Sequence, residues 1–169
     1  MSAGQLTARQ GDIVSAARGL LASEGVEAVT VGRVAAALGI KPPSLYKHFA
    51  SKRALEAVLI AEGFEASAEA LSAAGPGLAA VARAYRGFAT ANPHLYRLMT
   101  ERPLPRDLLP AGLEARAAAP LVAAAGDPET ARAAWAFAHG MVVLELAGRF
   151  PPDADLDAAW DRGVAAFGG

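Results

Sequence analysis

The sequence contains no cysteine, few aromatic residues and little charge. Among its 169 residues, 7% are aromatic and 20% are charged. Without cysteine, disulfide frameworks, thiolate metal sites and cysteine nucleophiles are excluded. The three histidines, at positions 48, 94 and 139, do not have metal-ligand spacing, and there is no glycine-rich phosphate loop or nucleophile elbow. The sequence therefore predicts no enzyme activity, no metal site and no cofactor.

Segments that would target or anchor the chain in a membrane are also missing. Residues 1–10 have no apolar core of the kind found in signal peptides. The most apolar stretch, residues 133–148, contains His139 and Glu145 and is shorter than the roughly 20 residues needed to cross a bilayer. We interpret it as a buried helix and expect a cytoplasmic protein with no membrane partner.

What the sequence has in abundance is alanine, within a hydrophobic fraction of 53%. Alanine is the best helix former, and strand-type runs of β-branched and aromatic residues are nearly absent, so we predict an all-α protein. The charge is unevenly distributed. Residues 1–53 carry seven Lys and Arg against three Asp and Glu, whereas residues 54–169 carry nine against fourteen. This asymmetry indicates that the N-terminal end meets a polyanion.

Capping residues and helix breakers divide the chain into helices. Thr7 and Gln10 form a capping-box pattern for a helix that ends near Gly25, and Thr30 is a candidate N-cap for a short second helix. Further helices are expected at 43–49, 51–74, 78–91, 94–100, 113–125, 128–149 and 154–167. The Gly75-Pro76-Gly77 break suggests a DNA-binding domain at 1–53, a connecting helix at 54–74 and a second domain, a helical bundle, at 75–169.

The two short helices on either side of Gly39 have the pattern of a helix-turn-helix, in which the second helix enters the DNA major groove. Leu45 and Phe49 are four residues apart, so they share the inward face. The outward face is short, polar and basic, and consists of Ser44, Tyr46, Lys47 and His48.

Lys52 and Arg53 begin the fourth helix, where the helix dipole is already positive and two cations are unfavourable. A phosphate bound at this end would explain them. The alternative is an ordinary helix start exposed to solvent.

Residues 28–40, 44–49 and 51–55 resemble the DNA-binding signature of the TetR family, most specifically in the order Leu-Tyr-x-His-Phe-x-x-Lys from Leu45 to Lys52. The resemblance covers residues 7–60. It implies a homodimer, a palindromic double-stranded DNA operator, and repression that a ligand relieves.

Carried over residue by residue, the resemblance implies phosphate contacts from Thr30, Tyr46 and Lys52. It implies base or groove contacts from Ser44, Lys47 and His48. Arg33 lies within the same signature and joins the predicted DNA-binding set. The chain departs from the family pattern just before the third helix, where Lys41 precedes Pro42-Pro43 in place of the usual Ser or Thr. Lys41 is therefore a candidate for an additional phosphate or guanine contact.

The stretch from Ala134 to Met141 resembles the Trp-His-Gly type of C-terminal domain in the same family. An apolar helical bundle with a few polar groups is typical of small-molecule sites. The residues expected to surround a small hydrophobic effector are Tyr85, Phe88, Tyr96, Met99, Trp135 and His139, with Phe137 and Met141 as further candidates and Arg86 as a possible partner for an anion. Each of them could equally be an ordinary core residue.

The last two helices are the expected dimer interface, because Ala138, Gly140 and Ala147 allow close helix approach and Trp160 and Phe167 could anchor it. Glu145 lies in an apolar run and, if buried, requires a partner. An alternative function also remains: a helical protein–protein adaptor whose helix-turn-helix is vestigial.

Overall fold

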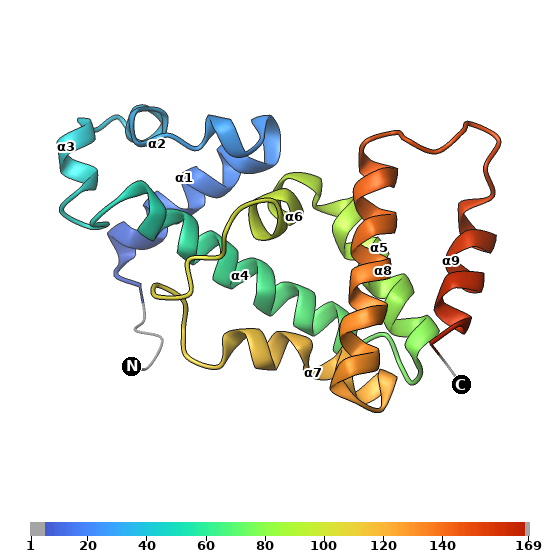
Figure 1. Cartoon of the computed structure of the whole chain (residues 1–169). Coiled ribbons are helices and arrows are strands. Elements are labelled where there is room, and N and C mark those ends of the chain that lie inside the picture. Colours follow the sequence, from blue (N-terminus) through green and yellow to red (C-terminus); the bar gives the residue numbers. More distant parts are fainter. Residues whose placement is uncertain (1–5, 168–169) are drawn as a thin grey trace. The chain divides into compact units, whose positions relative to one another are not determined.

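A computed structural model describes residues 6–167, so the first five and last two residues of the predicted domains lie outside it. Every regular element in the described range is helical, as predicted (Figure 1). The elements are α1 (Ala8–Glu24), the 3₁₀ helix η1 (Val26–Ala28), α2 (Val31–Ala37), α3 (Pro42–Leu45), α4 (Lys52–Ser72), α5 (Leu78–Ala91), α6 (Pro93–Thr100), α7 (Leu113–Ala125), α8 (Pro128–Leu146) and α9 (Leu156–Ala165).

The helices begin at the capping residues that the sequence suggested. The Thr7 hydroxyl accepts from the Gln10 amide at 3.2 Å, and the Gln10 side chain accepts from the Thr7 amide at 2.9 Å. Thr30 caps α2 in the same way, accepting from the Arg33 amide at 3.2 Å. Asp127 accepts from the Thr130 amide at 2.8 Å, and hydrogen bonds from the Thr130 side chain and amide lower the pKa of the Asp127 carboxyl.

The helices α3, α4, α8 and α9 are shorter than predicted, and α3 and α8 fall furthest short at their C-terminal ends. α3 ends at Leu45, because the His48 amide bonds back three residues to the Leu45 carbonyl and tightens the chain into a turn. α8 ends at Leu146, because Gly148 has a φ of 59°. The amides of Gly148 and Arg149 bond to the carbonyls of Glu145 and Leu144, which closes a Schellman motif.

The described residues form two compact units, and the division differs from the sequence break at Gly75. The N-terminal unit comprises residues 6–64 and 94–113, and the C-terminal unit comprises residues 65–93 and 114–167. The single helix α4 contributes to both, and the chain returns to the N-terminal unit through α6.

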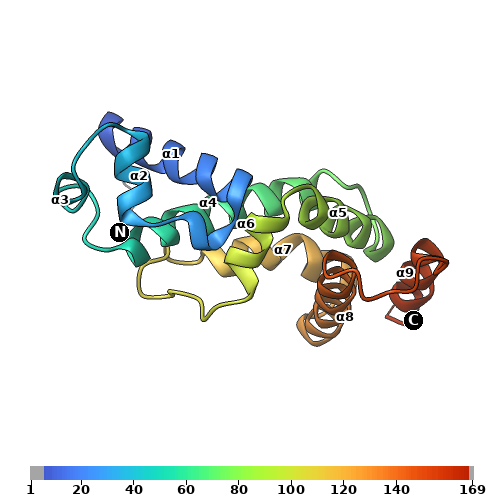
Figure 2. The same cartoon turned by 90° about the horizontal axis from the view of Figure 1, so that it is seen from above.

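The N-terminal unit has a core of large aliphatic side chains. It includes Ile13 and Leu21 from α1, Leu45 from α3, and Leu55 and Leu59 from α4, all no more than 2% exposed. In the C-terminal unit, α5, α8 and α9 contact one another pairwise (Figure 2). Alanines at positions 131, 134 and 138 form most of the buried face of α8.

Candidate DNA-binding surface and effector site

The core of the N-terminal unit fixes the orientation of α3. Leu45 and Phe49 are buried at 0% and 6% exposure, as predicted, while Tyr46 is 54% exposed. The Gln10 side chain of α1 donates to the His48 carbonyl at 3.1 Å and holds the turn after α3. Lys47 is also exposed, and Ser44 and His48 are half-buried. The polar side chains of α3 and of the turn after it therefore face away from the core.

The basic residues near α3 fall into two groups. Lys41 and Lys47 are exposed, and neither has a carboxylate within ion-pair distance among residues 6–167. Arg33, by contrast, pairs with Glu24 at 2.6 Å, and this hydrogen bond lowers the pKa of the Glu24 carboxyl. An unpaired ammonium can approach a phosphate without first leaving a carboxylate.

The start of α4 offers a second explanation for the two cations that the sequence places there. Lys52 lies 3.3 Å from Glu56, and Arg53 donates two hydrogen bonds to Asp107, which lowers the pKa of that carboxyl. Carboxylates of the same unit therefore offset the two cations at this helix N-terminus. Their presence alone does not require a bound phosphate.

Thr30 is exposed and uses a hydroxyl lone pair as the cap of α2. Its O–H hydrogen remains a possible donor, because a hydroxyl both accepts and donates. The cap therefore leaves the phosphate contact expected at this residue chemically available.

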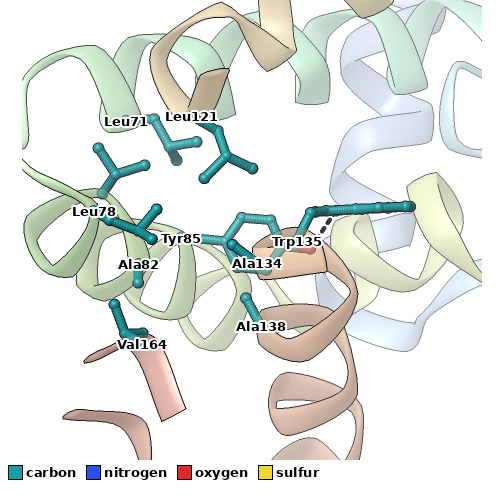
Figure 3. A pocket seen from close by; sticks show the side chains of 10 residues that line it. Leu71, Leu78, Ala82, Tyr85, Leu121, Ala134, Trp135, Ala138 and Val164 are labelled. Atoms are coloured by element: carbon teal, nitrogen blue, oxygen red, sulfur yellow. Dashed lines mark hydrogen bonds between the residues drawn. The ribbon is translucent and has the colours of Figure 1, made fainter. Parts of the chain in front are cut away.

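In the C-terminal unit, side chains from α4, α5, α7, α8 and α9 converge on a small apolar cavity (Figure 3). Its volume is about 10 Å³, room for about one water molecule. The lining residues are Leu71, Leu78, Val81, Ala82, Tyr85, Leu121, Ala134, Trp135, Ala138 and Val164. An effector larger than water would have to move these side chains apart.

The structure brings together only part of the predicted effector set. Tyr85 and Trp135 line the cavity, and the Trp135 indole donates to the Tyr85 hydroxyl at 3.1 Å. His139 stacks on Trp135 with ring centroids 5.8 Å apart. Phe88 is half-buried on α5 and does not line the cavity.

Tyr96 and Met99 belong instead to the N-terminal unit, where both are buried. The Met99 side chain packs on Gly63 of α4 so closely that a Cβ there would lie 2.6 Å from the sulfur. The leucines and alanines that do line the cavity were not predicted, because nothing in a sequence distinguishes them from ordinary core residues.

Arg86, suggested as a partner for an anionic ligand, is instead engaged within the chain. Its guanidinium donates to Glu145 at 2.9 Å and to Asp157 at 2.5 Å, and these bonds raise its pKa. It also lies over the Trp160 ring, 5.6 Å from the centroid. Glu145 thus has the partner that its apolar surroundings required. Arg86, Glu145, Asp157 and Trp160 are called the Arg86 cluster below.

The Arg86 cluster corrects the expectation that Trp160 anchors a dimer. Trp160 is 3% exposed and packs edge-to-face on Phe137 of α8 within the same chain. Phe167 also contacts Phe137, with centroids 5.9 Å apart. Ala138 faces the cavity at 6% exposure and so lies on the inner side of α8.

Two family models match different parts of the chain. The model described as bacterial regulatory proteins of the tetR family matches residues 13–59. The model described as tetracyclin repressor-like, C-terminal domain, matches residues 78–167, more than half of the chain. The chain belongs to the TetR family. Trp135, His139 and Gly140 lie within the second match, and the family recognised from the sequence is confirmed.

Relatives of known sequence and structure support the assignment to this family of transcriptional regulators. An uncharacterized HTH-type transcriptional regulator of Mycobacterium tuberculosis, Rv0681, is 33% identical over 88% of this chain and 74% of the relative. A crystal structure of the regulatory protein SCO4313 has a TM-score of 0.76 at 24% identity, with 94% of each chain covered. A TetR variant of Acinetobacter baumannii in complex with minocycline has a TM-score of 0.62 at 27% identity, covering 93% of this chain and 92% of that one.

None of the helices in residues 6–167 is long and apolar enough to span a bilayer. Within the same residues, no group of three His, Cys, Asp or Glu side chains could hold a metal ion.

Proposed function

We propose that the chain is a transcriptional repressor that binds a palindromic operator as a homodimer and is released by a small effector. The observation that carries the proposal is the outward face of α3 and of the turn that follows it. There Tyr46 and Lys47 are exposed beside Lys41, while Leu45 and Phe49 fix the helix in the core. In this proposal the outward side chains of α3 read the major groove.

The proposed homodimer is supported by the outer face of α8. Trp135 is 48% exposed and Leu144 is 42% exposed. The exposed Ala133 and Ala136 and the half-buried Gly140 share the side of α8 that faces away from its buried alanines. Large exposed apolar residues along one helix favour a second copy of the chain as the partner. Sedimentation at micromolar concentration tests this, and a strictly monomeric species, free and on DNA, would contradict it.

The proposed effector response depends on α4, the helix that belongs to both units. Two α3 helices must lie about 34–36 Å apart to reach successive major grooves. An effector that opens the cavity favours a different arrangement, and it releases DNA only by the difference in its affinity for the two states. The complex of the Acinetobacter baumannii TetR variant with minocycline supports a small-molecule ligand for a chain of this fold.

Selection of DNA from random duplexes tests operator binding. The selected operator should be palindromic, and Tyr46→Ala should weaken binding to every sequence, whereas Lys47→Ala should also change base preference. Arg83→Gln is a matched control, because Arg83 lies on α5, away from the outer face of α8, and its partner Asp161 is also exposed. If neither a selected operator nor low-salt binding to any duplex is found, the adaptor function becomes the better description.

A further inference from the structure

A surface groove of about 500 Å³ lies beside the apolar cavity in the C-terminal unit. The last turn of α4, the following turn and the first turns of α5 form one wall. One face of α7 forms the other wall, at the helical spacing 116, 119, 120, 123 and 124. The groove is lined by Leu71, Ser72, Gly75, Pro76, Gly77, Val81, Arg116, Ala119, Pro120, Ala123 and Ala124.

The groove and the cavity share Leu71 and Val81. These two side chains are buried, at 5% and 3% exposure, and each contacts both spaces. A small shift of either would join a space that holds about one water to one that can hold a small molecule. The groove is therefore separated from the proposed effector cavity only by these two side chains.

The lining of the groove indicates what kind of molecule it fits. Small and apolar residues form most of its surface, and among the described residues that line it Arg116 alone is charged. A guanidinium has five N–H donors in a planar fork, so Arg116 can bind a carboxylate in addition to the contacts it already makes. The groove is thus mainly apolar, with a cation exposed on its α7 wall.

We propose that this groove is the outer half of the effector site and that the effector is an amphipathic carboxylic acid. Its carboxylate binds Arg116, and its apolar chain passes between Leu71 and Val81 into the cavity lined by Ala134 and Ala138. The inference rests on the proposed function, because it assigns a chemical class to the effector of that function. It also explains how a cavity too small for a ligand can become part of a binding site.

Calorimetry with the full chain tests the carboxylate contact, using decanoate as the probe and decanol as its uncharged counterpart. We expect decanoate to bind about fivefold more tightly, the upper range for an exposed ion pair. Arg116→Gln should remove the preference for the acid and leave decanol binding unchanged. Arg83→Gln, the control defined above, should keep the preference. Equal binding of acid and alcohol by the parent protein, or a preference that survives Arg116→Gln, would overturn the proposal.

A series of straight-chain acids tests whether the apolar chain passes Leu71. Each added CH₂ should increase affinity about fourfold while the chain enters the cavity. Leu71→Trp should abolish this dependence on length, and Val81→Ala should strengthen binding of the longer acids. Circular dichroism shows whether Leu71→Trp folds. If it does not, the test rests on Val81→Ala, which must bind the longer acids more tightly than the parent protein does. No dependence on chain length in the parent, or the same dependence in a folded Leu71→Trp protein, would refute the path.

The failure of this inference can be distinguished from failure of the proposed function. Operator binding by the parent protein without any acid tests the repressor function alone. If the chain binds its operator and is released by a neutral apolar compound but by no carboxylate, the repressor function stands and the proposed carboxylate site in the groove is wrong. If the chain binds acids as expected but binds no operator, the groove site stands and the proposed repressor function is wrong.

Discussion

The N-terminal and C-terminal units are packed with different side chains. Of the ten largest fully buried side chains in the described residues, nine lie in the N-terminal unit and only Val142 lies in the C-terminal unit. The buried face of α8 is instead largely alanine, and charged and aromatic groups of the Arg86 cluster join α5, α8 and α9. The first unit resembles a close-packed aliphatic core, whereas the second depends on small residues and polar contacts.

This difference suits two different tasks. Interlocking Leu, Ile and Val side chains resist displacement, because an interior at crystal-like density has no space for movement. A reading helix only four residues long, α3, needs such a base. Helices that meet through alanine can shift by small amounts without forcing large side chains past one another. The C-terminal unit is therefore the better candidate for a region that opens around an effector.

The largest expected effect comes from deleting a core leucine in the N-terminal unit. Leu59→Ala removes a side chain that is 1% exposed and should lower the free energy of unfolding by about 2–5 kcal/mol. Leu121→Ala, at the half-buried edge of the cavity, should cost less, at about 1–2 kcal/mol. Urea denaturation measures both. Equal losses would mean that the two cores do not differ in packing in the way described.

The next largest effect is expected at the Arg86 cluster. Arg86→Met leaves Glu145 without its partner, and because both side chains are about one-fifth exposed we expect a loss of about 1–3 kcal/mol. Replacing Glu145 by Leu in the same protein should restore much of the loss, since no half-buried charge then remains unpaired. Arg83→Met is the matched control. Its pair with Asp161 is long, at 3.8 Å, and exposed, so the change should be within about 0.5 kcal/mol.

Local rules predicted the helices well, because their signals are confined to a few neighbouring residues. Thr7, Thr30 and Asp127 cap helices through hydrogen bonds to amides three residues away. The inward positions of Leu45 and Phe49 followed from their spacing of four. Such contacts require no knowledge of the rest of the fold.

Contacts between distant segments could not be predicted in this way. Arg53 donates hydrogen bonds to Asp107, which is 54 residues away in sequence, and Arg86 donates to Glu145, which is 59 residues away. Without these carboxylates in view, the sequence suggested a bound phosphate at Arg53 and an anionic ligand at Arg86. Tyr96 and Met99 were placed with the effector set for the same reason. They follow Gly75 in sequence, but α6 packs in the N-terminal unit.

Salt titrations of DNA binding compare the two groups of basic residues. Lys41→Ala and Lys47→Ala should each lower the slope of log affinity against log salt by about one for each phosphate that the variant no longer neutralises. Lys52→Ala and Arg33→Ala should lower it less, because those cations already neutralise Glu56 and Glu24 and must leave them to reach DNA. A Lys52→Ala protein with as large a change as Lys47→Ala would show that DNA displaces the carboxylate.

The smallest effect is expected from the exposed carboxylates of the N-terminal unit. Hydrogen bonds from Arg33 and Arg53 lower the pKa values of Glu24 and Asp107, respectively. A carboxyl whose pKa is lower in the folded state stabilises the fold above its unfolded pKa, and this contribution is lost as the pH falls through the folded value. The melting temperature should therefore fall on acidification below about pH 4. The Glu24→Gln, Asp107→Asn double variant should lose less stability over the same range.

The same pH titration also tests the comparison between the two units. Asp127 of the C-terminal unit has a lowered pKa from local bonds to Thr130, whereas Glu24 and Asp107 depend on an arginine side chain. High salt screens charge between exposed groups more than it weakens a short cap hydrogen bond. Added salt should therefore reduce the acid sensitivity contributed by Glu24 and Asp107 and leave that of Asp127 largely intact. If salt has no effect on the difference between the parent and the double variant, the arginine pairs do not cause it.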